Sequence, residues 1–374
     1  MRLLSLVSAA PDPCGVEDFA RKLAARFDAR PGNDHASLAL SGSWSDLRAL
    51  WKASGEGDVV VMNLPLVAWK KLILSPLLAL LLVRLRRGRS IVVLHEWSGM
   101  DWRRRLVLAP CLALASQLRA CTPRVERELT RSPLAPFLGA RGDVVPIPAN
   151  LAKPLELPDT DLSMRLASLR SQGRVIIGQF GSICPKKRNL VLLAVAAELR
   201  SRGLDVVSVF VGSFIKGRDT VEEDFWEAVK ELDLVERVIV SGYIEAADEV
   251  FAALSQIDVF VYSFEEGLES NRGSVLTALL AGRPVIVNAP RSPHEFDHHP
   301  TYQQFLRSDS LRLVPTDTDT AALADAVQPA IRGQLTSAIP EAREMWSNVV
   351  DAFAGAIDFT EADGAGRGPD RAPP

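Results

Sequence analysis

Short apolar runs alternate with longer amphipathic stretches along the chain, a pattern typical of parallel α/β proteins. The apolar runs predict buried strands at residues 3–7, 37–40, 58–62, 91–94, 119–122 and 143–147, and again at 175–180, 206–211, 238–240, 259–262, 285–287 and 311–314. Helical periodicity predicts helices at residues 16–27, 44–52, 186–202, 221–232, 246–255, 274–281 and 321–331. Because the alternation occurs in both halves, we expect two Rossmann-like domains.

The length of 374 residues also fits two α/β domains. Pro146, Pro148 and Pro154 indicate the crossing between them. A further helix is expected around Trp346, and the Gly-, Pro- and charge-rich end of the chain is predicted to be disordered. The expected ranges are 1–155 for the N-terminal domain, 170–335 for the C-terminal domain, 340–359 for the last helix and 362–374 for the tail.

Composition indicates an ordinary enzyme of the cytoplasm. The chain is 47% hydrophobic and 24% charged, with a formal net charge of −3, which argues against a nucleic-acid partner. Its four cysteines show no pairing pattern, as expected in a reducing compartment. The apolar N-terminal run is too short for a signal peptide and is interrupted by Asp12, so we interpret it as a strand.

Residues 69–90 are apolar in the middle and basic at both ends. The apolar run is too short to span a bilayer as a helix. One interpretation is a core helix with a solvated basic end. The other is a peripheral contact with anionic lipid on the inner face of the cell membrane. The cations available for that contact are Lys70, Lys71, Arg84, Arg86 and Arg87.

The most informative stretch is residues 258–288, which predicts a strand, a polar loop, a helix and a second strand. In open α/β sheets ligands bind at the carboxyl ends of the strands, where this loop begins. The loop also leads into the N-terminus of the helix, where free N–H groups and the helix dipole favour an anion. Gly273 would let a phosphate approach the backbone closely.

This stretch resembles the nucleotide-sugar-binding segment of glycosyltransferase family 4, whose members have the GT-B fold. The matching positions are Leu276, Ala278, Gly282, Pro284, Val285 and Ile286. The alignment puts Glu269 on the first glutamate of the family pattern, which lies near the donor sugar, and Thr277 on the second, which holds the ribose. The Arg272-Gly273-Ser274 variant of the segment is familiar among polysaccharide-synthesis members, and we assign these three residues to the donor phosphates.

Three cations stand in what we expect to be the first turn of helix 186–202. Each would face the positive end of the helix dipole at a cost of up to about 1 kcal/mol, and a bound anion would offset that cost. The family carries a basic residue here that grips the diphosphate. The resemblance implies that Lys187 has this role, with Lys186 or Arg188 as helper. The alternative is a solvated basic turn.

Other candidates also follow expected strands. His95 and Glu96 end the strand at 91–94, and family members often have a histidine here that contacts the donor sugar. The resemblance places Gly15 near the acceptor or the donor, and Glu96 could orient an acceptor hydroxyl, so we assign both to the acceptor side. Tyr243 lies in a segment like the one that precedes the base-binding region. The alternatives are a histidine that holds a loop and, at Gly15, a plain turn.

A cluster of His294, Asp297, His298 and His299 could hold a metal, but the family needs none, so we expect neither metal nor cofactor.

These observations lead us to expect a GT-B glycosyltransferase with two Rossmann-like domains facing a cleft and a C-terminal helix crossing back to the first domain. The resemblance implies metal-independent transfer, with retained anomeric configuration, of a hexose-type sugar from a nucleoside diphosphate to a glycan or lipid-linked acceptor in exopolysaccharide or cell-envelope polysaccharide synthesis. Two alternatives stay open. One is a nucleotide-sugar epimerase or isomerase of the same fold, and the other is a catalytically weak partner subunit, which Thr277 favours.

Overall fold

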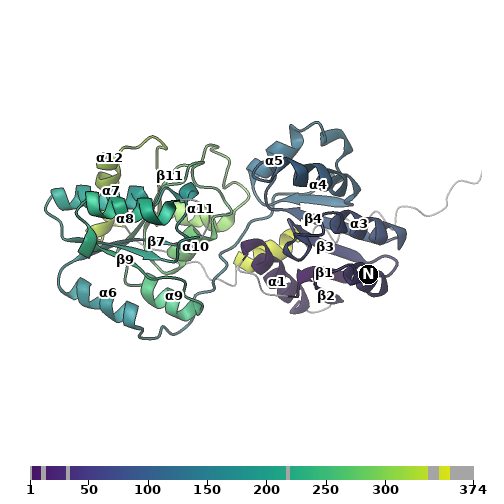
Figure 1. Cartoon of the computed structure of the whole chain (residues 1–374), viewed down its shortest axis with the longest axis horizontal. Coiled ribbons are helices and arrows are strands. Elements are labelled where there is room, and N and C mark those ends of the chain that lie inside the picture. Colours follow the sequence, from purple (N-terminus) through teal and green to yellow (C-terminus); the bar gives the residue numbers. More distant parts are fainter. Residues whose placement is uncertain (1, 10–13, 31–33, 216–219, 336–344, 354–374) are drawn as a thin grey trace, which may run out of the picture. The chain divides into compact units, whose positions relative to one another are not determined.

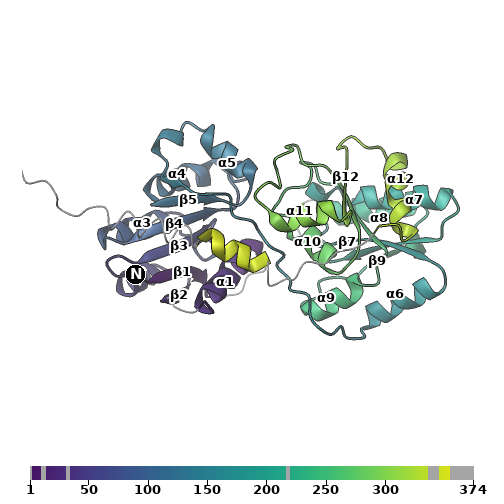
Figure 2. The same ribbon diagram turned by 180° about the vertical axis from the view of Figure 1, so that it is seen from behind.

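The computed structural model describes residues 2–9, 14–30, 34–215, 220–335 and 345–353. The chain forms two compact units, Met1–Ile147 with Trp346–Pro374, and Pro148–Met345 (Figures 1 and 2). Among the described residues, none of the helices combines the length and hydrophobicity that crossing a bilayer requires.

The first unit is built on a six-stranded sheet with the strand order β2-β1-β3-β4-β5-β6, in which every pairing is parallel. The strands are β1 (Leu3–Ser8), β2 (His35–Leu40), β3 (Val59–Leu64), β4 (Arg89–Leu94), β5 (Gln117–Ala120) and β6 (Ala140–Arg141). The helices are α1 (Gly15–Asp28), α2 (Ser45–Ala53), α3 (Ser75–Leu85), α4 (Trp102–Leu114) and α5 (Pro123–Thr130), with 3₁₀ turns η1 (Val67–Trp69) and η2 (Ala135–Phe137). The central strands are buried on both faces, as expected for a parallel sheet.

Residues 345–353 are helical, and those from Trp346 onward complete the core of the first unit. Trp346 stacks on Phe19 with ring centroids 5.7 Å apart, and Phe353 meets Phe27 edge-on at 5.6 Å. Val349 and Val350 are buried in the same cluster. The expectation that the C-terminal helix returns to the N-terminal domain is confirmed.

The second unit contains another six-stranded parallel sheet, in the order β12-β11-β10-β7-β8-β9. The strands are β7 (Val175–Phe180), β8 (Val206–Val211), β9 (Val238–Val240), β10 (Val259–Tyr262), β11 (Val285–Asn288) and β12 (Leu311–Val314). The helices are α6 (Asp161–Ser171), α7 (Leu190–Ser201), α8 (Val221–Glu231), α9 (Ala247–Leu254), α10 (Gly273–Leu280), α11 (Pro300–Arg307) and α12 (Thr320–Ile331), with 3₁₀ turns η3 (Pro185–Lys187) and η4 (Val235–Arg237).

Strand order reverses once in each sheet. In the first unit β1 lies between β2 and β3, and in the second β7 lies between β8 and β10. At such a reversal the following helices leave to opposite faces of the sheet, so the loops at the carboxyl ends are the natural ligand site. The loops after β1 and β3, and those after β7 and β10, are therefore the positions to inspect.

Three elements differ from the sequence expectation. The strand expected at 119–122 is β5, two residues earlier. Residues 143–147 run beside β5, with the Val145 amide donating to the Ala120 carbonyl, but are not a strand. The second unit begins at Pro148 rather than near residue 170, and α6 belongs to it. Helices α5, α6 and α11 had not been expected; each buries only two or three side chains, so its apolar pattern is weak.

The helix expected at 186–202 begins only at Leu190. Arg188 adopts a left-handed backbone conformation with φ of 42°, which an α-helix cannot contain. The three cations therefore stand in η3 and in the residue after it, not in the first turn of α7, so the argument from that helix dipole was wrong.

Replacing Trp346 by alanine should destabilise the first unit by about 3–5 kcal/mol, because it leaves a cavity against Phe19. Hydrogen exchange should show lost protection in β1 and β3 but not in β7 and β8. Trp44→Ala, at a position 57% exposed, is the control and should change stability by less than about 0.5 kcal/mol. Equal protection in wild type and Trp346→Ala would contradict the packing role.

Candidate active site

Two loops of the second unit meet at the strand-order reversal, residues 181–189 after β7 and 263–272 after β10. The first is held by a buried polar network. Asn189 accepts from the Cys184 amide at 3.0 Å through Oδ1 and donates to Gln179 Oε1 at 2.7 Å through Nδ2. Gln179 in turn donates to the Val261 carbonyl at 2.8 Å. These bonds tie the loop to β7 and β10 and fix the turn that carries Lys187.

Lys187 lies beside the N-terminus of α10. A β-carbon built on Gly181, whose φ is +109°, would lie 2.6 Å from Lys187 Nζ and 3.4 Å from Ser274 Cβ. Burial lowers the pKa of Lys187 to about 8, although the nearby Cys184 raises it, and the Arg272 charge lowers it further. Within the described part of the chain, Lys187 has no carboxylate partner. A partly desolvated ammonium at a helix N-terminus is a binding site for an anion.

Arg272 and Glu269 form an ion pair at the start of α10. Arg272 Nη2 donates to Glu269 Oε2 at 2.9 Å, and the Glu269 side chain is only 14% exposed. The guanidinium lies over the Phe264 ring, 4.9 Å from its centroid, while its buried Nε has no partner among the described residues. The pair thus leaves donor capacity on Arg272 beside Lys187.

The loop that carries this pair is fastened from behind. The buried carboxylate of Glu295 accepts from both the Ser270 amide, at 3.0 Å, and the Ser270 hydroxyl, at 2.9 Å. Asn288 bonds the backbone of Phe264 in both directions, and Tyr302 Oη donates to the Arg272 carbonyl at 3.1 Å. The sequence had not indicated that Ser270, Glu295, Asn288 and Tyr302 support this loop. A polar residue directly after a buried strand, such as Asn288, was the available signal.

Gly273 and Thr277 occupy the first two turns of α10. A β-carbon on Gly273 would lie 3.8 Å from the Asn150 amide nitrogen, an ordinary contact, so the fold itself does not require glycine there. The small residue leaves space at the helix N-terminus. Thr277 is buried, and its hydroxyl donates to the Gly273 carbonyl at 2.9 Å inside the helix.

The remaining candidates of the second unit lie apart from this group. Tyr243 follows β9, the outermost strand on one side of the sheet, and is 72% exposed. Arg188 is exposed, and the side chain of Lys186 lies outside the described residues. The structure therefore brings together Lys187, Arg272, Glu269, Gly273 and Ser274.

The candidates of the first unit lie at the ends of β4 and β1. His95 Nε2 hydrogen-bonds Asn63 Oδ1 at 3.0 Å, and its ring meets Phe19 edge-on at 5.2 Å. Burial lowers the pKa of His95 to about 3, so the imidazole is neutral at physiological pH. Glu96 beside it is exposed, and Gly15 is the exposed first residue of α1.

The histidine-rich loop gives no metal centre. His294 pairs with Asp297 at 2.9 Å, whereas His299 is buried and accepts from the Tyr302 amide at the start of α11. Across the described ranges, no three His, Cys, Asp or Glu side chains are grouped closely enough to bind a metal ion.

Comparison with known proteins places this geometry in context. Residues 174–332 match the family model described as glycosyl transferases group 1. No curated protein sequence matches the chain significantly. Among solved structures, HepE of Anabaena in complex with UDP and glucose has 16% identity and a TM-score of 0.62, over 96% of this chain and 99% of that one.

Two further solved structures give the same picture. HepE with UDP-glucose has 15% identity and a TM-score of 0.64, over 97% of this chain and 100% of that chain. Sucrose-phosphate synthase from Thermosynechococcus elongatus has 17% identity and a TM-score of 0.63, over 98% of this chain and 100% of that chain. These similarities establish the fold that the sequence resemblance implied.

The Lys187 amine should titrate near pH 8, whereas a free lysine titrates at about 10.4. Competitive acetic anhydride labelling followed by mass spectrometry measures this directly. Arg272→Gln should move the midpoint upward, because it removes a neighbouring positive charge. Labelling of Lys187 with the midpoint of a free lysine in both proteins would refute the buried position.

Proposed function

We propose that this protein is a GT-B glycosyltransferase that moves a hexose-type sugar from a nucleoside diphosphate to a hydroxyl of a glycan or lipid-linked acceptor, as the match of residues 174–332 to the glycosyl transferases group 1 model supports. The observation that carries the proposal is the site formed by Lys187, Arg272 and the N-terminus of α10. Two cations and the positive end of a helix dipole at a strand-order reversal suit a diphosphate. The structures of HepE with UDP and with UDP-glucose support the same donor class.

In the proposed reaction the acceptor oxygen bonds to the anomeric carbon, and the bond from that carbon to the β-phosphate oxygen breaks. The nucleoside diphosphate leaves with the electron pair, and the hydroxyl proton passes to the departing phosphate or to solvent. Negative charge therefore grows on the phosphate as the bond breaks. Lys187 and Arg272 are fixed before the reaction, so they stabilise that charge without reorganising.

Glu269 is proposed to hold hydroxyls of the donor sugar. Its ion pair with Arg272 holds the carboxylate at the start of α10, where the diphosphate would lie. His95 is proposed to contact the donor sugar as a neutral hydrogen-bonding group, because its lowered pKa excludes an acid role near pH 7. Gly15 and Glu96 are proposed for the acceptor side and Tyr243 for the nucleotide.

Thr277 is proposed as part of the wall near the ribose and not as an acid, since its hydroxyl is engaged inside α10. We further propose that transfer retains the anomeric configuration, needs no metal and serves polysaccharide synthesis. The group 1 family match and the resemblance of the Arg272-Gly273-Ser274 segment support this assignment.

Calorimetry with UDP, GDP, ADP and the matching nucleosides tests the donor class. One diphosphate should bind, and Lys187→Ala should weaken it far more than its nucleoside, because only the phosphates lose a charge-assisted bond. Wild-type affinity should fall as pH rises above about 8, where free Lys187 loses its proton, and Lys187→Arg should remove this dependence. Absence of binding to any nucleoside diphosphate would reject the enzyme and favour a non-catalytic partner.

Glu269→Gln keeps the side-chain shape and removes its charge. Losing charge-assisted bonds of roughly 1.5–3 kcal/mol should slow transfer by tens- to hundredfold with little change in diphosphate affinity. Thr277→Val is the comparison: it should raise the donor KM more than it lowers kcat. A wild-type transfer rate in Glu269→Gln would show that the sugar contact is misassigned.

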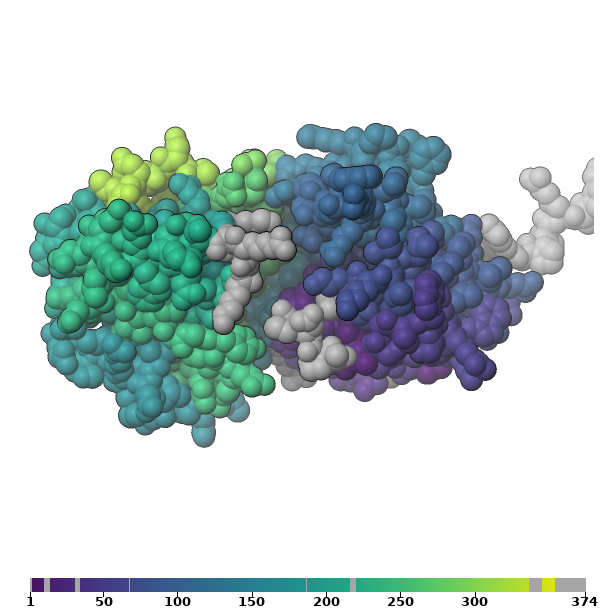
Figure 3. Space-filling view, in the orientation of Figure 1, coloured from purple at the N-terminus to yellow at the C-terminus, as the bar shows by residue number. Residues whose placement is uncertain are grey.

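A peripheral membrane contact through α3 and α4, at the cytoplasmic face, is also proposed. The inner face of α3, including Leu80 and Val83, is buried in the core. Its outer face and that of the adjacent α4 expose large apolar side chains, and Figure 3 shows this part of the first unit at the surface. The exposed residues are Ile73, Leu74, Leu81, Leu85, Trp102 and Leu106, next to Lys70, Lys71, Arg84, Arg103 and Arg104.

Two of the expected membrane cations have partners within the fold. Arg86 donates to the Ser54 carbonyl at 2.8 Å and lies over Trp51, and Arg87 pairs with Glu56 at 3.1 Å. Arg86 is therefore not available for the membrane contact. Arg103 and Arg104 of α4 lie next to the exposed apolar residues instead, and the sequence pattern did not connect them with this segment.

Vesicle flotation tests this contact. The protein should bind phosphatidylglycerol-containing vesicles at low ionic strength and leave them as salt rises. Leu85→Glu should weaken binding, because it puts a charge into the apolar face, whereas Val235→Glu, at another exposed apolar position in the second unit, should not. Equal binding by both variants would remove α3 from the contact.

A further inference from the structure

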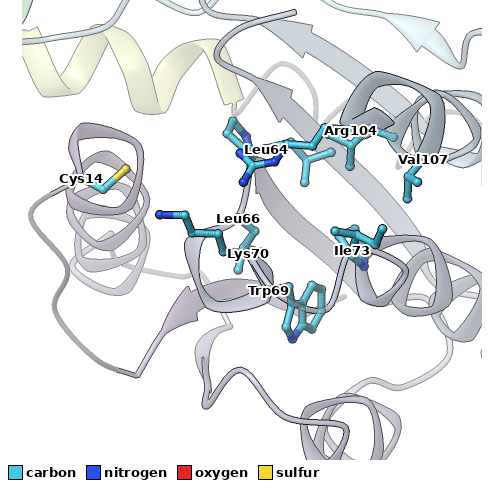
Figure 4. Close-up of a pocket in the computed structure, with 11 residues that line it drawn as sticks. Cys14, Leu64, Leu66, Trp69, Lys70, Ile73, Arg104 and Val107 are labelled. Carbon is cyan, nitrogen blue, oxygen red and sulfur yellow. The ribbon is translucent and has the colours of Figure 1, made fainter. Parts of the chain in front are cut away.

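A separate cavity of about 350 Å³ opens in the first unit (Figure 4). It lies at the carboxyl end of β3, beside the residue that precedes α1, and therefore at the strand-order reversal of this sheet. Its volume is at the lower end of the range for small-molecule sites, roughly 300–1,000 Å³. The lining residues are Cys14, Leu64, Pro65, Leu66, Trp69, Lys70, Ile73, Pro76, Arg104, Val107 and Leu108.

The wall is fixed by buried hydrogen bonds. Trp69 Nε1 donates to Asp46 Oδ2 at 2.9 Å. Although burial opposes ionisation, hydrogen bonds from Ser41, Trp69 and neighbouring amides hold the pKa of Asp46 below its usual value. Ser8 Oγ donates to the buried Glu17 at 2.8 Å and accepts from the Ala68 amide at 3.0 Å. The turn that carries Trp69 and Lys70 is therefore held without a ligand.

The lining is divided between apolar and cationic side chains. Trp69, Ile73 and Val107 lie on one side of the view, and the charged ends of Lys70 and Arg104 lie toward α1 on the other (Figure 4). Among the residues that the structure describes, no carboxylate lines the cavity. Among the described residues, neither Lys70 nor Arg104 has an ion-pair partner. The matching ligand is apolar at one end and anionic at the other.

The cavity also continues into the apolar surface of α3 and α4. Ile73 lines it and is 47% exposed, next to Leu74 at 50%. Arg104 lines it from α4, whose Trp102 and Leu106 are 61% and 67% exposed. A ligand in the cavity could therefore keep the rest of its chain on that surface. A free glycan fits less well, because its hydroxyls need many polar partners and the described lining is mostly apolar, with charged groups only at Lys70 and Arg104.

We propose that this cavity binds the phosphate and the adjoining hydrocarbon of a lipid-phosphate-linked acceptor, with the phosphate at Lys70 and Arg104 and the chain along Trp69, Ile73 and Val107. This rests on the proposed function and selects one of its two acceptor classes. Lys70 and Arg104 are positioning residues in this assignment, since they hold the lipid phosphate and not the reacting sugar hydroxyl.

Calorimetry with three probes tests the cavity: decyl phosphate below its micelle concentration, decanol and inorganic phosphate. Decyl phosphate should bind most tightly, because only it satisfies both ends of the lining. The Lys70→Ala/Arg104→Ala double variant should weaken decyl phosphate by about tenfold or more and leave decanol unchanged. Ile73→Trp should weaken both alkyl probes, because the larger side chain fills the cavity.

The matched control is Arg48→Ala/Lys52→Ala, which removes the same charge from exposed positions of α2 that lie outside both the lining and the proposed membrane surface. It should bind decyl phosphate like wild type. Equal loss in the two double variants would show diffuse surface charge and overturn the site. Inorganic phosphate binding as tightly as decyl phosphate, or no binding of decyl phosphate at all, would overturn it as well.

UDP, GDP and ADP titrations of the same proteins separate this inference from the proposed function. The cavity variants should keep wild-type nucleoside diphosphate affinity, because the donor site lies in the second unit. If a diphosphate binds and decyl phosphate does not, the lipid assignment fails alone. If decyl phosphate binds and no nucleoside diphosphate does, the transferase proposal fails and the amphiphile site remains.

Discussion

Parallel pairing in both sheets is the constraint on which the chemistry of this molecule depends. It brings the carboxyl ends of all strands to one edge of each sheet, and the single reversal of strand order leaves two loops there that no crossover helix covers. Lys187 and Arg272 enter the second unit's site from the loops after β7 and β10, and the cavity of the first unit opens between the ends of β1 and β3. The same topology thus creates a candidate binding position in each unit.

Both positions use buried polar groups to hold their loops. Asn189 with Gln179, Glu295 with Ser270, and Asp46 with Trp69 each satisfy a buried amide or carboxylate completely enough to keep one loop geometry. Such groups are costly to bury unless they are bonded, so their presence beside the candidate sites is consistent with preorganisation for a ligand. It also explains why the charged residues that face the sites, Lys187 and Lys70, can remain without carboxylate partners among the described residues.

Local pattern was enough to find most of the framework. The limits expected for β7, β8, β9, β10 and β12 agree with the structure, because a run of β-branched residues buried on both faces has no other stable arrangement. Trp346 likewise indicated where the C-terminal helix lies, because it is a large apolar residue that is buried in the core. The sequence predictions were wrong where local backbone structure depends on packing against other elements. Arg188 takes a left-handed conformation that no periodicity reports, and α6 and α11 bury too few side chains for their periodicity to stand out.

The sequence alone determined the fold class and the loop containing Glu269 and Arg272, because hydrophobic period and glycine placement act over a few residues. Only the tertiary structure decided the properties that depend on distance and burial. These include the lowered pKa of Lys187, the neutrality of His95 and the hydrogen bond from Arg86 to the Ser54 carbonyl, which keeps Arg86 from the proposed membrane contact. The cavity joins Cys14, Ile73 and Arg104, which are far apart in the chain. Desolvation and proximity arise from packing between elements, and no local pattern encodes which elements will pack.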